Sequence, residues 1–448
     1  MKQYARYASA LFFVAAFSAA FLGGEPAVDG QNWSRWRGPE DNGMAVGDAP
    51  MHWSDTKNIK WKIDIPGKGH SSPVIWGDKL FLTAAISAGP ILEPQAGGPG
   101  GGRGRGMRLG KANGVEHKFV VLCLDKNTGK TLWEKTVKVA KPHEGYHVRY
   151  GSFASNSPVT DGKNLFAYFG SRGIYAFDLD GNLLWEKDLG EMRKILQFGE
   201  GNPPVLHGDK LILKRDHQGQ SFIVALDKNT GKELWRKDRD EMSSWSAPLV
   251  VEHGGRTQAV VSGTTKTRGY DLETGEVIWE AAGLGRNVIP NPVIQDDIVI
   301  VMSGYRDPNL LAIRLGGKGD LTDSDAILWT NQRANAYTAS PLLHDNKLYF
   351  VTDNGFFSCF NATTGEPYYQ QVRLPKPYSF KASPVGANGK LYLSTEDGDV
   401  VVLKMGEKYE VIATNTLEGH SFISSPAIVN GEIFLRSETS LFCIREMN

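Results

Sequence analysis

The chain has 448 residues, of which 50 are basic and 50 are acidic, so its formal net charge at pH 7 is zero. This balance argues against a nucleic-acid partner, because contacts to phosphates need a basic surplus or a basic face. Hydrophobic residues make up 41% of the chain and include 11 Trp, 15 Tyr and 20 Phe, which is ample for a large core, while 51 Gly mark frequent turns. Such a composition is typical of many short strands.

The N-terminus has the pattern of a signal peptide, which we expect over residues 1–20. Lys2 and Arg6 give a positive start, residues 8–24 form an apolar stretch, and small residues at 18–20 offer a cleavage site. A retained membrane anchor is the alternative, but the stretch is short for a spanning helix and no stop-transfer pattern follows it. We therefore expect an exported chain, periplasmic or extracellular, with no membrane span after cleavage.

After an N-terminal extension (21–58), one phrase recurs to the end of the chain. A small polar residue before proline is followed by an apolar run and a turn, at Pro73, Pro158, Pro204, Pro248, Pro292, Pro341, Pro384 and Pro426. Successive prolines lie 42 to 49 residues apart, except for a first gap of 85. That gap contains a Gly/Pro/Arg-rich insertion (87–114), which cannot bury a core and is interpreted as flexible. Without the insertion, the period is that of one four-stranded propeller blade.

Each repeat unit is expected to form four antiparallel strands. In the unit at 157–189, an entering strand and a Gly turn precede two segments that alternate in polarity, as half-buried strands do, and a second turn leads into "NLLWEKDL". Eight such units predict an all-β fold, an eight-bladed β-propeller over residues 59–448.

The turn before the fourth strand carries a repeated motif. "DKNTG" occurs at 125–129 and again at 227–231. Asp125 is suited to an Asx turn, and Gly129 to the positive φ that ends the loop. Trp133 follows four residues later and is expected to pack between neighbouring blades. The spacing recurs at Gly181/Trp185, Gly231/Trp235 and Gly275/Trp279.

The last unit, at 425–448, supplies only three strands before the chain ends. The segment 59–66 alternates in polarity and contains Trp61, so we expect it to complete the last blade and to pair an edge that would otherwise be exposed. The three cysteines, at positions 123, 359 and 443, all stand two residues before the turn of their unit, where other units have small residues. They are expected to be buried and unpaired, without metal-ligand spacing.

Ligands of a propeller bind at the mouth of its central channel, to which the loops before the prolines lead. Aligning the units on proline places these polar and aromatic candidates at the mouth: Arg149, Tyr150, Asn156, Glu200, Trp245, Arg286, Asn287, Lys381 and His420. The loop 146–156 is our first choice for a functional surface. The alternative is that these residues merely line a hydrated channel. No metal-binding or catalytic set is predicted from this pattern.

With "DKNTGKELW" repeated and eight units counted, the chain resembles the pyrroloquinoline-quinone-like (PQQ-like) β-propellers. The phrase "NWSRWRGPEDNG" (32–43) is similar to an N-terminal segment of a secreted bacterial branch. Two classes share this repeat. Quinoprotein dehydrogenases bind the quinone and Ca²⁺ in the central funnel, under a lid of adjacent cysteines. Outer-membrane assembly (BamB-like) propellers use the ring as a docking platform.

The sequence has no adjacent cysteines and no haem attachment sequence, C-x-x-C-H. We therefore predict a non-catalytic scaffold, monomeric and without cofactor, that docks an envelope protein or a small ligand at the channel mouth. The alternative is a PQQ-dependent dehydrogenase that oxidises alcohols or sugars with Ca²⁺ in the funnel. Trp245 favours this second interpretation, because a flat indole suits a stacked quinone.

Overall fold

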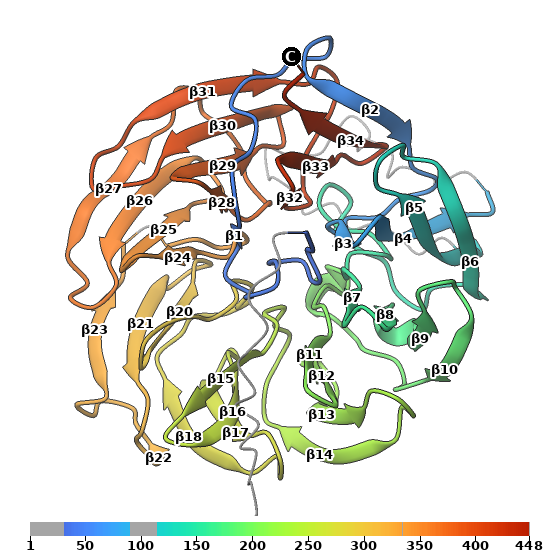
Figure 1. The fold of residues 1–448 in the computed structure, drawn as a ribbon. Helices are drawn as coiled ribbons and strands as arrows, with labels where there is room; N and C mark the ends of the chain where they lie inside the picture. The colour runs from blue at the N-terminus through green and yellow to red at the C-terminus, as the bar shows by residue number, and fades with distance from the viewer. Residues whose placement is uncertain (1–30, 90–113, 334, 448) are drawn as a thin grey trace, which may run out of the picture.

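A computed structural model describes residues 31–89, 114–333 and 335–447, and these residues form eight sheets arranged around a central channel (Figure 1). The predicted eight-bladed propeller is confirmed. The predicted signal peptide and nearly all of the 87–114 insertion lie outside the described residues, so both stay predictions. In the described part, no helix is both long enough and apolar enough to cross a membrane.

The first four blades follow one another along the chain, and each begins at the channel. Blade 1 contains β3 (Val74–Trp76), β4 (Lys79–Ser87), β5 (His117–Asp125) and β6 (Thr131–Ala140). Blade 2 contains β7 (Val159–Thr160), β8 (Asn164–Tyr168), β9 (Ile174–Asp178) and β10 (Leu183–Lys187). Blade 3 contains β11 (Val205–His207), β12 (Lys210–Arg215), β13 (Ser221–Asp227) and β14 (Glu233–Arg239). Blade 4 contains β15 (Leu249–His253), β16 (Arg256–Val261), β17 (Lys266–Asp271) and β18 (Val277–Ala282).

Blades 5 to 7 repeat the pattern. Blade 5 contains β19 (Val293–Gln295), β20 (Ile298–Ser303), β21 (Asn309–Arg314) and β23 (Ile327–Asn331). Blade 6 contains β24 (Leu342–His344), β25 (Lys347–Val351), β26 (Phe356–Asn361) and β27 (Pro367–Arg373). Blade 7 contains β28 (Val385–Ala387), β29 (Lys390–Ser394), β30 (Asp399–Lys404) and β31 (Val411–Thr416). Two short strands add to blades by parallel pairing. Strand β1 (Met44–Ala45) of the N-terminal extension pairs with β28 of blade 7, and β22 (Gly319–Asp320) pairs with β18 of blade 4. Two 3-10 turns are η1 (Gly170–Arg172) and η2 (Ile195–Gln197).

Blade 8 joins the two ends of the described chain. Its inner strands are β32 (Ala427–Val429), β33 (Glu432–Arg436) and β34 (Ser440–Arg445), and its outer strand is β2 (Ile59–Asp64). Trp61 faces Cys443 in the antiparallel β2–β34 register, so the predicted closure is confirmed. Figure 1 shows β2 beside β34 at the point where the ring closes.

The repeated turn joins neighbouring blades. The indole N–H of Trp133 donates to Leu179 O of the next blade at 3.1 Å, and that of Trp185 donates to Lys228 O at 2.9 Å. A Cβ on Gly231 would lie 2.6 Å from the Trp185 ring, and the φ of this glycine is +69°. Glycine is therefore required twice over, by the backbone conformation and by the neighbouring tryptophan.

The cysteine positions follow from the same packing. Cys123 lies opposite Trp133 across its sheet, and Cys359 lies opposite Tyr369, as Ala225 lies opposite Trp235. A small residue leaves room for the large ring beside it. All three cysteines are buried and free, and burial raises the pKa of Cys123 and Cys359 to about 12, so they are inert small residues as predicted.

Candidate functional site

The N-terminal extension lies across the channel. Trp33 pairs with Ile75 of β3, and Gly43 O accepts from Gly386 N of β28 at 2.9 Å, so the segment 33–45 spans from one blade to another across the ring. Figure 1 shows this segment in blue at the centre of the ring. The segment therefore closes the channel below the mouth.

Arg37 fastens the segment in place. Its side chain is almost completely buried and donates to Pro384 O at 2.9 Å and to Pro341 O at 2.8 Å, carbonyls of two neighbouring blades. Burial lowers the pKa of Arg37 to about 10. Five guanidinium N–H groups suit a point where several carbonyls converge. The phrase "NWSRWRGPEDNG" is thus a structural plug, a role that the sequence pattern alone did not indicate.

A cavity of about 410 Å³ lies above the plug. Trp36 of the plug lines it, and rings from several blades form its walls: His147, Tyr150, Phe198, Trp245, Tyr305 and Tyr337. This volume is in the range of small-molecule sites. The charged side chains that line it are Glu200, Asp353 and Lys381.

The structure brings together four of the nine residues proposed from sequence, because Tyr150, Glu200, Trp245 and Lys381 all line this cavity. Arg149 and Arg286 are exposed at the rim. Asn287 is buried beside Tyr337, whose pKa is raised to about 12 by burial.

Asn156 lines a separate small cavity, and His420 lies outside the main cavity. The ring of His420 packs edge-on against Phe442 at 4.8 Å, and its Nε2 is 3.1 Å from Lys62 Nζ on the outermost strand of blade 8. Alignment on proline placed His420 at the mouth, but its side chain is directed to the blade.

One rim cluster links blades 1, 6 and 7. Lys381 Nζ lies 2.7 Å from Asp353, 3.3 Å from Glu396 and 4.4 Å from the centre of the Tyr150 ring. Burial lowers the pKa of Lys381, but the charge and hydrogen bond of Asp353 together with the charge of Glu396 outweigh it, and the net shift is upward. Arg149 pairs with Glu396 at 3.1 Å, while its own side chain is 63% exposed. The loop 146–156 is therefore anchored to the far side of the mouth and presents a free guanidinium edge to solvent.

Trp245 is held from three directions. Its indole N–H donates to Gly199 O at 2.8 Å, its backbone N–H donates to Val288 O at 2.7 Å, and Lys194 Nζ lies 4.9 Å from its ring centre. Burial lowers the pKa of Lys194 to about 8. The indole is thus a fixed wall of the cavity.

The residues before the prolines form a chain of hydrogen bonds around the channel. Ser340 N donates to Ser383 Oγ at 2.9 Å, Ser383 N donates to Ser425 Oγ at 2.9 Å, and Ser425 N donates to Ser72 Oγ at 3.0 Å. Three further bonds of this kind link Ala247 to Asn291, Asn291 to Ser340 and Ser72 to Ser157. In six of the eight blades the small polar residue before the proline is therefore an inter-blade contact that also lines the cavity, while blades 3 and 4 have Pro203 and Ala247 in that place.

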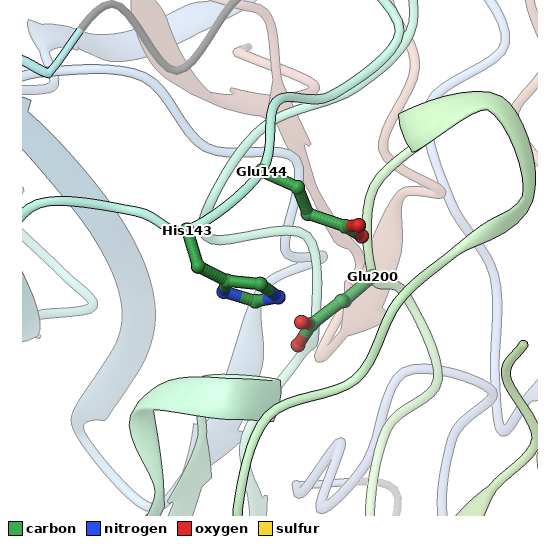
Figure 2. A group of neighbouring side chains, drawn as sticks. All are labelled: His143, Glu144 and Glu200. Carbon is green, nitrogen blue, oxygen red and sulfur yellow. The ribbon is translucent and has the colours of Figure 1, made fainter. Parts of the chain in front are cut away.

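His143, Glu144 and Glu200 are turned toward one another beside this cavity (Figure 2), with possible ligand atoms within 4.8 Å. A carbonyl only accepts and a guanidinium only donates, so His143 Nε2–H donates to Met192 O and Nδ1 accepts from Arg172, both at 2.7 Å.

Neither nitrogen of His143 is therefore free for a metal ion. The Glu200 carboxylate accepts from the backbone N–H and the hydroxyl of Ser171. Burial raises the pKa of Glu144. The geometry favours a network that fixes the mouth loops over a metal site.

Known proteins resemble this chain in sequence and in structure. The family model described as "Outer membrane protein assembly factor BamB" matches residues 117–371, more than half of the chain. An outer membrane protein assembly factor BamB from Moranella endobia (strain PCIT) is 24% identical over 205 residues, which cover 41% of this chain and 50% of that protein. A second, from Francisella salina, is 31% identical over 98 residues, or 22% of this chain and 17% of that protein. The chain thus spans half or less of the length of these relatives.

Solved structures share the fold. BamB from Moraxella catarrhalis has a TM-score of 0.56 and 14% identity, covering 86% of this chain and 96% of that one. Quinohemoprotein alcohol dehydrogenase from Comamonas testosteroni has a TM-score of 0.62 and 9% identity, covering 92% of this chain and 80% of that one. A propeller of this kind therefore occurs both in an assembly factor and in an enzyme, and the site has to decide between them.

Proposed function

Because the chain belongs to the outer membrane protein assembly factor BamB family, we propose that it is an exported, non-catalytic docking scaffold in outer-membrane protein assembly. The family match is the observation that carries this proposal. The predicted signal peptide supports export, to the periplasm. The partner is then an envelope protein that docks on the rim, where the exposed Arg149 and Arg286 leave charge available for its surface.

The quinone-dependent alternative finds less support in the arrangement of side chains. Glu200, which lines the cavity together with Trp245, already accepts two hydrogen bonds from Ser171. A Ca²⁺ ion takes about six to eight oxygen ligands. The lining offers two carboxylates, Glu200 and Asp353, and Asp353 is already paired with Lys381. Cys123, Cys359 and Cys443 lie in three different blades and form no lid. These features weigh against the quinone-dependent alternative.

The proposal is tested by expressing the chain in a Gram-negative strain that lacks its own BamB and measuring outer-membrane protein levels. Restoration is expected, and Arg149→Ala should reduce it. Arg314→Ala is the matched control, because that exposed arginine also pairs with a carboxylate, Asp297, but lies at the far end of β21. No restoration by a folded, exported chain would contradict the proposal. So would quinone-dependent dye reduction with simple alcohols after incubation with PQQ and Ca²⁺.

A further inference from the structure

The chain of hydrogen bonds around the channel leaves its own hydroxyl protons unused. The five serines each accept one backbone N–H through Oγ, and among the described residues none donates a hydrogen bond from that hydroxyl: Ser72, Ser157, Ser340, Ser383 and Ser425. All five are at most 5% exposed and line the cavity. Asn291 accepts through Oδ1, and its amide likewise donates to no described group. An incomplete circle of free donors, from six of the eight blades, therefore lines the cavity, at a depth where unpaired donors are costly.

The charges around the circle argue against an anion as the partner of these donors. Lys381 is the one cationic lysine or arginine among the lining residues, and it is already shared by Asp353 and Glu396. Burial lowers the pKa of His70 and of His147, so both rings are neutral at pH 7. Glu200 and Asp353 add acceptors. The lining thus offers donors and acceptors to a neutral ligand that has both.

The walls and the floor limit the shape of such a ligand. Tyr305 and Tyr337 stack on each other with ring centres 5.2 Å apart. The Trp245 ring is a second wall, held by its bond to Gly199 O, and Trp36 of the plug also lines the cavity. Flat apolar faces beside hydrogen-bonding groups suit a ring that is apolar on its faces and polar at its edge. The plug prevents a chain from threading through, so only a small molecule or an end residue fits.

From these observations we infer that the cavity beneath the rim binds the end residue of a neutral glycan. A pyranose ring packs a C–H face on the aromatic walls, its oxygens accept from the serine hydroxyls and the Asn291 amide, and its hydroxyls donate to Asp353 or Glu200. This inference rests on the proposed function only in taking the channel mouth as the binding face. It requires no catalysis. The glycan would bind in the cavity, whereas a protein partner would dock on the rim above it.

The test uses the purified chain with glucose, cellobiose and N,N′-diacetylchitobiose. Binding is measured by calorimetry and by the total tryptophan fluorescence, to which Trp36 and Trp245 contribute from the cavity lining. Saturable binding of at least one sugar is expected. Asn291→Asp keeps the oxygen that accepts from Ala247 N but replaces the donating amide, and it should weaken binding about fivefold or more. Ser383→Ala should do the same. Ser324→Ala, a serine remote from the cavity that bonds Leu321 O, should leave binding unchanged.

Thermal unfolding of each variant separates lost binding from lost folding, and Asn291→Asp remains informative if Ser383→Ala unfolds. No binding of any of the three sugars would overturn the inference and leave water as the partner of the hydroxyls. Binding of acetate or of N-acetyltryptophanamide in place of sugars would also overturn it, in favour of an anion or a peptide side chain. If either result were obtained while outer-membrane protein levels were still restored in cells, it would contradict the glycan inference alone and would leave the proposed docking function unaffected.

Discussion

At the scale of single residues, a buried charge network lies around Ser244, the residue before Trp245. Asp216 pairs with Arg239 at 2.7 Å and with Lys214 at 3.5 Å, and all three side chains are shielded from solvent. Burial lowers the pKa of Lys214 from 10.5 to about 7, although Asp216 opposes the shift. The folded pKa thus lies below the unfolded one. Below about pH 7 the lysine is charged in both states and its buried charge destabilises the fold, and this penalty is relieved as the pH rises toward 10.5.

We therefore expect the free energy of unfolding to rise with pH for the wild type relative to Lys214→Met, between pH 7.5 and 9.5. The slope of the difference is at most about 1.4 kcal/mol per pH unit, the value of one proton. Urea unfolding at several pH values measures it. Lys130→Met, at an exposed lysine of blade 1, should show no such slope. A difference that stays flat or falls with pH would mean that Lys214 keeps its proton in the folded state.

Residue by residue, the cavity was only partly predictable. Tyr150, Glu200 and Trp245 lie in the loops that lead to the repeat prolines, so the repeat pattern predicted their place at the mouth. Tyr305 and Asp353 follow the second strand of their blades. The turn between the second and third strands reaches the same face of the ring, but it carries no proline that marks the repeat. Inspecting the residues after each second strand would have supplied the missing signal.

The serine bonds show a different limit. Ser340 and Ser383 were visible as repeat markers, but their partnership crosses blades 43 residues apart in sequence. A single chain's pattern does not state such a pairing, because it depends on the radius of the closed ring.

At the scale of elements, the turn and the tryptophan of adjacent blades form one joint. Gly231 has both a positive φ of +69° and the Trp185 ring at 2.6 Å from its missing Cβ, whereas Gly208 has a φ of +57° with nothing within 4 Å. Gly231→Ala and Gly208→Ala share the backbone strain, about 1–2 kcal/mol for an alanine in that region. Only the first also displaces an indole. Chemical unfolding should rank Gly231→Ala as the less stable variant, and equal losses would show that the ring yields freely.

The spacing of glycine and tryptophan predicted this joint for most blades, because the period is local. It did not predict the exception. Trp279 donates to Gln258 at 2.7 Å within its own blade, and β22 covers the outer edge beside it. The longer loop of blade 5, which contains β22, changes what the indole can reach. A propensity argument cannot anticipate where an inserted strand docks.

At the scale of the whole molecule, the N-terminal region has two roles that truncation can separate. Residues 33–45 plug the channel, and Trp33 is completely buried there. Strand β2 completes blade 8, where the Trp61 ring packs 6.0 Å from Phe434 and its N–H donates to Lys126 O of blade 1. The sequence predicted the second role, because blade 8 lacked a strand. It left the first unassigned, because a plug has no period.

Three truncated chains should therefore differ in order. A chain from residue 31 keeps the plug and the closing strand and should unfold like the full-length mature protein. A chain from residue 57 loses the plug but keeps β2, so the ring should close with a lower melting temperature. A chain from residue 68 also loses β2, which exposes an edge of β34 to pairing with other molecules, and it should aggregate or fail to fold.

Trp61→Ala in the full chain gives the matching point change. Trp235→Ala removes a buried ring and should cost about 3–5 kcal/mol. Trp61 is half-buried, so its replacement should cost less, but in the same direction. The two tryptophans are far apart in sequence but occupy the same place in blades 8 and 3, each facing a small residue across its sheet. Melting curves and light scattering of the truncated chains measure the closure directly. If the chain from residue 68 is monomeric and has the same melting temperature as the chain from residue 57, β2 contributes nothing to the ring. The stability of blade 8 would then have to come from its three inner strands alone.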